Sequence, residues 1–244
     1  IETFSLPAHQ RLPTDHYEVK TFSIVGPIGS GKSTLAKEYY GSRIKGLWGD
    51  NSDYFLARDM WATIEAVKKS EKFCHYLIID DSIPMFDSRR SMSSQNVDMT
   101  QMFFEIRHEL KKYAKKSGGH AGGLVIICVI TQDYKAIDKR IRKGLAFTVF
   151  KAYDENCDEL IDDPTVIQVL KKIKDKTVRV GDYFYRQLAV AVDWEGRYTL
   201  FYADRSQLPK DLPFEYVTGD DIFIKQRNYL VQFLIDNFNL QEAS

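Results

Sequence analysis

A run of nine residues combines glycines, a lysine and hydroxyl side chains at a spacing that suits a bound polyphosphate. It is Gly26-Pro27-Ile28-Gly29-Ser30-Gly31-Lys32-Ser33-Thr34, and it matches the pattern G-x-x-x-x-G-K-[ST] from Gly26 to Ser33. Glycines let the backbone turn several N–H groups toward phosphates, and a helix that starts there adds the positive end of its dipole. Lys32 is expected to reach the β- and γ-phosphates, and the Ser33 hydroxyl to bind Mg²⁺. The pattern therefore predicts a site for ATP and Mg²⁺.

Two adjacent carboxylates, Asp80 and Asp81, follow the apolar run Tyr76-Leu77-Ile78-Ile79. This arrangement has the form of a Walker B strand, which delivers acids to the carboxyl edge of a sheet. We assign Asp80 to Mg²⁺, and Asp81 to orienting and deprotonating an attacking water. Apolar runs that end in Asp are common, so the motif gains weight only because it follows the phosphate-binding pattern.

Thr131-Gln132 ends the most apolar stretch of the chain, which begins at Leu124. A polar side chain at this point is expected to lie between the strand of the phosphate-binding loop and the strand of the two acids, near the γ-phosphate. Gln132 is then suited to hold the attacking water or to report loss of the phosphate. The simpler alternative is an ordinary turn residue at a strand end.

Strands and helices alternate along the first two thirds of the chain. Apolar runs predict strands at about 21–25, 44–48, 73–79, 124–131 and 146–151. Helical spacing predicts helices from the loop to about Tyr40, from Tyr54 to near Lys69, from Met102 to Tyr113 with a stop at Gly118-Gly119, and over about 135–142. This alternation predicts an α/β fold with a mainly parallel sheet that helices cover on both faces.

The C-terminal third has a different pattern. Asp193-Trp194-Glu195-Gly196 separates the apolar runs 183–192 and 197–202, which predicts a β-hairpin. A final helix is expected after Thr218. We therefore divide the chain into an N-terminal arm (1–19), a core (20–152) and a C-terminal elaboration packed on the same domain (153–244).

Charge is balanced, with 34 basic and 34 acidic residues among 244, so no global field indicates a nucleic-acid partner. Local asymmetry exists, however. Residues 134–143 carry five basic side chains against the single acid Asp138. Solvated surface and a DNA-facing role both fit this composition. The candidate DNA contacts in this stretch are Lys135, Lys139, Arg140 and Lys143.

The three cysteines form no C-x-x-C pair, and the five histidines are scattered, so we expect neither disulfides nor a His-ligated metal. No apolar run is long enough to span a bilayer, and no signal peptide is visible. These features predict a soluble, cytoplasmic protein.

These motifs together resemble the FtsK–HerA class of DNA-pumping P-loop ATPases. The resemblance rests on the phosphate-binding loop, the Walker B-like strand, the pair Arg107-His108 on a helix, and the strand that ends in Thr131-Gln132. It continues through residues 133–142 and 146–151, and covers about 21–151. It implies an ASCE/RecA-like P-loop fold and an ATPase that moves or packages double-stranded DNA as a homo-oligomer, a hexameric ring, in viral or plasmid settings. For a viral protein the location is the host cytoplasm.

Two positions depart from that class. Members carry Glu where this chain has Asp81, and a shorter acid must lie closer to the water or act through a second one. Several members also place an arginine near the end of the helix before the Thr-Gln strand, where it enters a neighbour's ATP site and stabilises the transferring phosphoryl group. This helix ends in Lys115-Lys116 instead. The remaining candidates for that role are Arg107, Arg89, Arg90, Arg140 and Arg142.

Two other functions fit the same loop. A small-molecule kinase uses a similar glycine segment, and Arg89-Arg90 would then belong to a phosphate-clamping lid. Such an enzyme leaves no role for the Thr131-Gln132 strand end. An ATP-binding switch without turnover is the third alternative, and tight nucleotide binding without hydrolysis would distinguish it.

Overall fold

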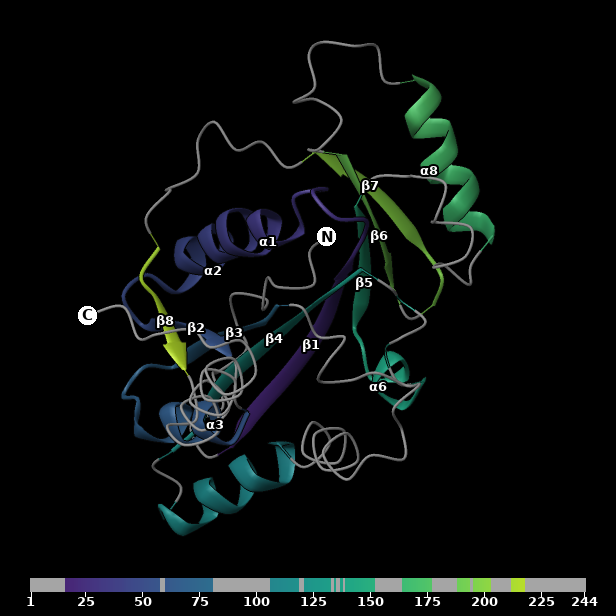
Figure 1. Cartoon of the computed structure of the whole chain (residues 1–244). Helices are drawn as coiled ribbons and strands as arrows, with labels where there is room; N and C mark the ends of the chain where they lie inside the picture. The colour runs from purple at the N-terminus through teal and green to yellow at the C-terminus, as the bar shows by residue number, and fades with distance from the viewer. Residues whose placement is uncertain are drawn as a thin grey trace, which may run out of the picture.

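A mainly parallel β-sheet lies between helices on its two faces in the computed structural model (Figure 1). The structure describes residues 16–57, 60–80, 106–118, 121–132, 134, 137, 139–151, 164–176, 188–193, 195–202 and 212–217. In these residues the sheet has eight strands in the order β7-β6-β5-β1-β4-β3-β2-β8. The strands from β5 to β8 in that order are parallel, and β6 and β7 add an antiparallel hairpin at the β5 edge.

The central strands are buried on both faces. The strands are β1 (Tyr17–Val25), β2 (Ser52–Ala57), β3 (Cys74–Ile79), β4 (Gly123–Thr131), β5 (Phe147–Lys151), β6 (Leu188–Asp193), β7 (Tyr198–Tyr202) and β8 (Phe214–Val217). Every residue of β3 and β4 is buried, which explains their continuous apolar sequences. The predicted α/β class with a mainly parallel sheet is confirmed.

The chain order of the strands determines which face each helix covers. From β1 the chain crosses to β2 in one direction, whereas β2 to β3, β3 to β4 and β4 to β5 all run the other way. Because such crossovers are right-handed, the first helix and the later ones lie on opposite faces. The helices are α1 (Lys32–Thr34), the π-helix η1 (Leu35–Tyr40), α2 (Gly41–Trp48), α3 (Met60–Lys69), an unlabelled helix over 106–116, α6 (Lys139–Lys143) and α8 (Pro164–Lys176).

Two apolar clusters hold these layers together. On one face, Tyr40 of η1 packs on Phe22 of β1 with ring centroids 4.8 Å apart, and Tyr76 donates a hydrogen bond of 3.0 Å to the Ala36 carbonyl. On the other face, Leu110 and Ile141 belong to a cluster with the side chains of β3 and β4. The continuous helix α1–η1–α2 is thus fixed over the strand that leads into the phosphate-binding loop.

Two expectations about residues 41–57 are wrong. The predicted strand at 44–48 belongs to α2, and the predicted helix start at Tyr54 lies in β2. Gly41 does not stop the helix: its φ is −58°, and a Cβ at this position would lie 2.6 Å from the Leu212 side chain. The helix ends at Gly49 instead, which has the positive φ of 56°. The glycine at 41 therefore serves close packing, and the glycine at 49 serves termination.

The other strands are where the sequence predicts them, at 21–25, 73–79, 124–131 and 146–151 within a few residues, and the hairpin of β6 and β7 is confirmed. The helix predicted from Met102 is confirmed over 106–116. The short basic helix predicted over about 135–142 is confirmed over Lys139–Lys143. Two elements were not expected: α8, which buries Val166 and Leu170 against Phe150, and β8, which pairs with β2. The final helix expected after Thr218 lies outside the described residues. No helix in the described ranges is long and apolar enough to cross a bilayer.

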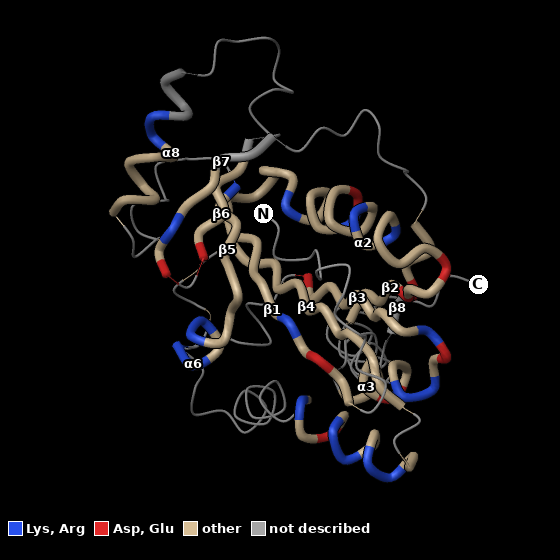
Figure 2. The backbone as a smooth tube through the Cα atoms, turned by 180° about the vertical axis from the view of Figure 1, so that it is seen from behind, with Lys and Arg blue, Asp and Glu red and all other residues tan. Residues whose placement is uncertain are grey.

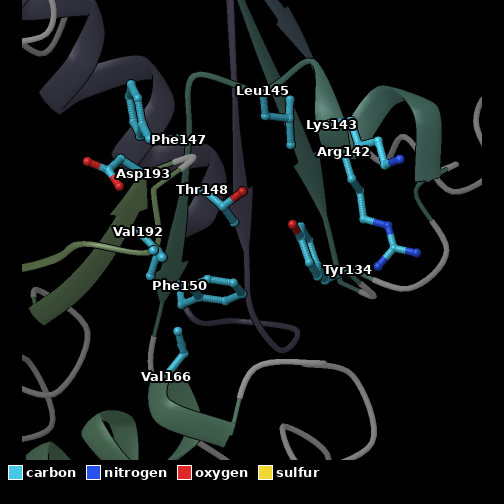
Figure 3. Close-up of a pocket in the computed structure, with 11 residues that line it drawn as sticks. Tyr134, Arg142, Lys143, Leu145, Phe147, Thr148, Phe150, Val166, Val192 and Asp193 are labelled. Atoms are coloured by element: carbon cyan, nitrogen blue, oxygen red, sulfur yellow. The ribbon is translucent and has the colours of Figure 1, made fainter.

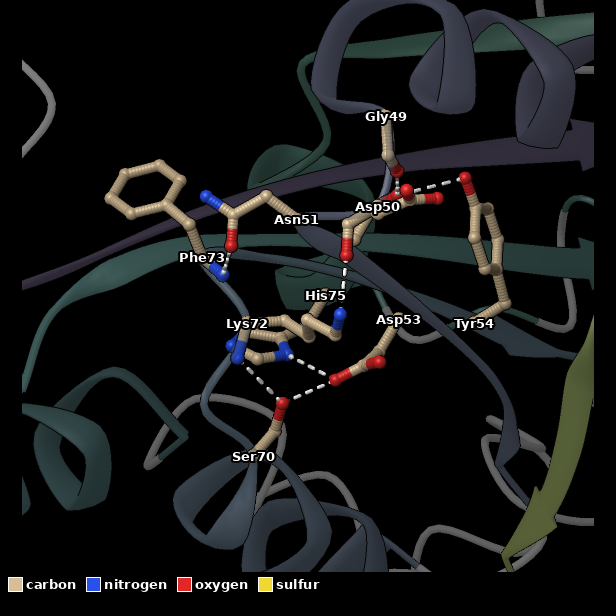
Figure 4. A network of polar contacts seen from close by, with 10 residues as sticks. Gly49, Asp50, Asn51, Asp53, Tyr54, Ser70, Lys72, Phe73 and His75 are labelled. Atoms are coloured by element: carbon tan, nitrogen blue, oxygen red, sulfur yellow. Dashed lines mark hydrogen bonds and ion pairs between the residues drawn. The ribbon is translucent and has the colours of Figure 1, made fainter.

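A buried histidine and a serine flank one carboxylate at the start of β2 and β3 (Figure 4). Ser70 Oγ donates a hydrogen bond to Asp53, and His75 Nδ1 lies 3.7 Å from the same carboxylate. In a catalytic triad the histidine stands between the serine and the acid, whereas here the acid is central. His75 is also fully buried, so no substrate reaches it. This network joins β2, β3 and the end of α3, and its role is structural.

Acidification is expected to destabilise the protein through His75. Burial lowers the pKa of its imidazole to about 4, against the opposing effect of Asp53, from an ordinary value of 6.5. Between these pH values the unfolded chain binds a proton that the folded chain does not. The contribution of His75 to the free energy of unfolding is therefore fully present above pH 6.5 and is lost as the pH falls toward 4. The loss approaches roughly 3 kcal/mol. Denaturant unfolding at several pH values measures it. His75→Phe should flatten the dependence, and an equal slope in both proteins would contradict this account.

Candidate nucleotide-binding site

The loop between β1 and α1 has a backbone that only glycine adopts without strain at two positions. Gly29 has φ 76° and Gly31 has φ 82°, both in the left-handed region. Gly26 is required for another reason, because a Cβ there would lie 2.3 Å from the carbonyl oxygen of Lys151 at the end of β5. The glycines of the pattern thus correspond to two positive φ angles and one close approach between strands.

Substituting Gly26 with alanine is expected to displace the loop from β5 and weaken ATP binding by at least about tenfold, because backbone cannot move aside as a flexible side chain does. Gly46→Ala is the matched control. Gly46 lies within α2 with open space around it, so alanine there should stabilise the protein by roughly 0.5–1 kcal/mol. Isothermal titration with an ATP analogue and thermal unfolding measure the two effects. Unchanged ATP affinity in Gly26→Ala would show that the loop tolerates a side chain.

Two polar side chains of the loop point to a phosphate ligand. Lys32 is 8% exposed, and its ammonium donates a hydrogen bond of 2.8 Å to the Pro27 carbonyl, across the loop. Ser30 Oγ is buried and has no hydrogen-bond partner among the described residues. Buried hydroxyl groups are ordinarily hydrogen-bonded, so the Ser30 hydroxyl is available to bond a ligand that the loop encloses. The residues present therefore fit a polyphosphate.

The ends of three neighbouring strands bring the other site residues to this loop. β4 lies between β1 and β3, and the Gly26 amide donates to the Thr131 carbonyl at the end of β4 over 3.4 Å. Gln132 follows directly and is half-buried. Asp80 follows β3 and is also half-buried. The strand that precedes Gln132 thus lies between the loop strand and the strand of the acids, and the role of Gln132 stays a prediction.

Ser33 and Asp80, which the sequence assigns to a divalent cation, follow β1 and β3 respectively. Their strands are separated by β4, which places the strand axes about 10 Å apart. This gap suits an ion held by a hydroxyl, phosphate oxygens and water with a carboxylate beyond, as Mg²⁺ prefers. The charge of Asp80 also acts on β4: burial, and to a lesser degree Asp80, raises the pKa of the Cys128 thiol.

Several predicted residues lie outside the described part of the chain. They are Asp81, Arg89, Arg90 and Lys135. Their roles stay predictions.

Arg107 lies toward the amino-terminal ends of the parallel strands, whereas the glycine loop follows the carboxyl-terminal end of β1. Its guanidinium donates a hydrogen bond of 3.3 Å to the carbonyl of Val19, in the first half of β1. Six residues of strand, about 20 Å, separate Val19 from the end of β1. Arg107 therefore does not reach the site of its own chain, and a role in phosphoryl transfer requires the site of a neighbouring copy.

The predicted DNA contacts Lys139, Arg140 and Lys143 are exposed on α6. Because α6 leads into the start of β5, these residues lie toward the amino-terminal ends of the parallel strands. This is the end of the sheet away from the glycine loop. A contact made there is coupled to the nucleotide only through the strands.

A separate cavity of about 390 Å³ lies on the face of β5 that α6 and α8 cover (Figure 3). The Arg142 guanidinium stands 5.2 Å from the centre of the Tyr134 ring, and that ring packs edge-on against Phe150. Thr148, on the cavity wall, accepts a hydrogen bond from Ser23. Its lining includes no residue from 26 to 34, so it is distinct from the glycine loop.

Sequence reasoning missed two features of this region. Lys151 is 2% exposed and its backbone contacts Gly26, but only the pairing of β1 with β5 places it there, and no local signal announces that pairing. The second is the basic surface of the helix over 106–116. Its signal was present in the sequence, as lysines at spacings of four.

No protein-family model matches the chain, and no curated protein matches it. Solved structures do resemble it. The genome-packaging NTPase B204 of Sulfolobus turreted icosahedral virus 2, in complex with AMP, is 14% identical, with 76% of this chain and 98% of that chain covered and a TM-score of 0.47. B204 of Sulfolobus turreted icosahedral virus, a DNA-packaging ATPase, is 13% identical over 79% of this chain and 100% of that chain, with a TM-score of 0.48. The N-terminal domain of zonular occludens toxin from Neisseria meningitidis is 13% identical over 77% of this chain and 95% of that chain, with a TM-score of 0.41.

The strand order and the glycine loop define the class of protein without these likenesses. A parallel sheet with β4 between β1 and β3, and a helix that starts on the glycine loop, is an α/β P-loop NTPase fold.

Proposed function

We propose that this protein is a Mg²⁺-dependent ATPase that works as an oligomeric motor on double-stranded DNA. The observation that supports ATPase activity most directly is the loop from Gly26 to Thr34, whose positive-φ glycines and buried Ser30 hydroxyl suit phosphates. Gln132 follows β4, which neighbours the loop strand β1, and Asp80 follows β3, the strand beyond β4. The location that fits this function is the cytoplasm, of the host if the protein is viral.

In this proposal each side chain has one task. The loop N–H groups and Lys32 bind the β- and γ-phosphates, and Ser33 and Asp80 hold the cation. When bound, Mg²⁺ neutralises charge that develops on the phosphates. Asp81 accepts a proton from the attacking water, and Gln132 orients that water. Thr34 and Ile28 complete the loop, with Ile28 at its exposed tip.

The motor part of the proposal rests on the resemblance of the motifs to the FtsK–HerA class and on the exposed cations of α6. Contacts by Lys139, Arg140, Lys143 and Lys135 would be made to phosphates, without reading sequence. A homo-oligomer, in that class a hexameric ring, would let Arg107 of one copy serve the ATP site of the next.

ATP turnover with and without double-stranded DNA tests the function. We expect slow release of inorganic phosphate from the protein alone, and stimulation by duplex DNA that disappears at high salt. Chromatography with light scattering, in the presence of ATP, measures whether a ring assembles. Transfer of the phosphate to a small acceptor would show a kinase. Tight ATP binding without phosphate release, with or without DNA, would show a switch.

A further inference from the structure

The helix over 106–116 presents basic side chains along almost its whole exposed side. Its buried positions include Ile106, Leu110 and Ala114, which face the sheet. Its exposed positions form two adjacent columns with a repeat of about 6 Å along the axis. The first column is Arg107, Lys111 and Lys115, and the second is His108, Lys112 and Lys116.

Neighbouring elements extend this surface. Tyr113 donates a hydrogen bond of 2.8 Å to the Lys68 carbonyl, which joins the helix to the end of α3. The only acid between 106 and 116, Glu109, bonds Lys112 over 2.6 Å. The pKa of Glu109 is lowered first by that bond and further by the charges of Lys68 and Lys116. Lys68 lies at the margin of this surface, where its ammonium is paired with Glu65 over 2.7 Å. We call the two columns together with Lys68 the basic face. Figure 2 shows Lys and Arg, in blue, repeated along this helix.

Stabilisation of the helix alone does not explain the basic face. Lysines in the last turn compensate the negative end of the helix dipole, and this accounts for Lys115 and Lys116. Lys111 lies in an earlier turn, where that effect is absent. Arg107 also lies in an earlier turn, and its hydrogen bond to the Val19 carbonyl accounts for part of its role. Like charges four residues apart also repel each other, so each column costs the isolated helix some stability. A partner that carries negative charge is the simplest reason to keep them.

We propose that the basic face binds the phosphate backbone of double-stranded DNA. The two columns provide a row of cations about as long as the helix, roughly 16 Å, which suits a linear polyanion. A membrane surface is a poorer match, because helices that lie in a bilayer interface expose apolar side chains, and the exposed positions here are charged or polar. A neighbour's triphosphate needs a single cation rather than two columns. The inference rests on the proposed motor function and names its DNA-binding surface.

Affinity for DNA as a function of salt tests the basic face. The test variant is Lys111→Gln/Lys115→Gln, which removes two charges of one column at little cost in helix propensity. The control is Lys45→Gln/Lys172→Gln, which removes two exposed charges from α2 and α8. The probe is a labelled duplex of mixed sequence, titrated from about 50 to 200 mM salt. We expect the test variant to bind roughly 10- to 100-fold more weakly and its logarithmic salt slope to fall by about 1.8. The control should match the wild type.

The remaining outcomes separate this inference from the proposed function. If the wild type binds DNA and the test variant binds it equally well, the basic face is wrong while the motor function stands. A wild type that does not bind duplex DNA overturns both. If the test variant keeps its DNA affinity but hydrolyses ATP more slowly than the wild type in assays that contain no DNA, the basic face would instead contact the nucleotide of a neighbouring copy. Wild-type binding to vesicles of anionic lipid that the test variant loses, again at unchanged DNA affinity, would assign it to a membrane.

Discussion

Lys32→Ala is expected to abolish ATP binding at ordinary concentrations, with a loss of affinity of at least about 100-fold. A hydrogen bond to a charged group is worth roughly 1.5–3 kcal/mol, and Lys32 is expected to make more than one to the phosphates. The variant also loses the hydrogen bond from Lys32 to the Pro27 carbonyl across the loop. Binding of a fluorescent ATP analogue measures the effect directly.

Lys45→Ala is the matched control for this prediction. Lys45 is exposed near the end of α2, in the same continuous helix that Lys32 begins. Thermal unfolding of both variants shows whether the loop change unfolds the protein. If Lys32→Ala folds and still binds ATP with near wild-type affinity, the glycine loop is not the ATP-binding site.

Asp81→Asn is expected to bind ATP normally and to hydrolyse it roughly 10²- to 10⁴-fold more slowly, since asparagine does not accept the proton of the attacking water. Single-turnover hydrolysis, with binding measured separately, distinguishes the two steps. Asp81→Glu should retain turnover, because it restores the longer acid of the class that the motifs resemble.

The neighbouring acid provides the sharpest comparison. Asp80→Asn is expected to weaken the dependence of ATP hydrolysis on Mg²⁺, because this carboxylate is assigned to the cation. Asp50→Asn changes an exposed acid before β2, at the other edge of the sheet, and should have no effect. If Asp80→Asn kept its response to Mg²⁺ and lost only the hydrolysis step, the two aspartates would have to exchange roles.

The site was more predictable from the sequence than the arrangement around it. The glycine loop is a local pattern, because each glycine answers a constraint within a few residues of backbone or from the next strand. The expected place of Gln132 depends on β4 lying between β1 and β3, which the strand order shows and which alternation of strands and helices does not by itself determine. The positive φ angles of Gly29 and Gly31 are local to the loop, whereas the constraint on Gly26 comes from Lys151, which is distant in sequence.

The errors arose where tertiary contacts decided the outcome. Both Ile44–Trp48 and Ser52–Ala57 are short and largely apolar, and only pairing with β3 and β8 makes the second one the strand. The helix continues through Gly41, which has helical dihedral angles, and the glycine leaves room there for Leu212, which is distant in sequence. β8 is four residues long and gains its partner, β2, from the far end of the chain. Periodicity within a short window contains none of this information.

The most direct test of the central claim is a crystal structure with Mg²⁺ and a non-hydrolysable ATP analogue. The account predicts triphosphate density enclosed by the backbone of residues 26–34, with Lys32 moved from the Pro27 carbonyl onto the phosphates. It also predicts the cation between Ser33 and Asp80, and Gln132 facing the γ-phosphate. Nucleotide bound elsewhere, for instance in the cavity beside Tyr134 and Phe150, with the glycine loop empty, would contradict it.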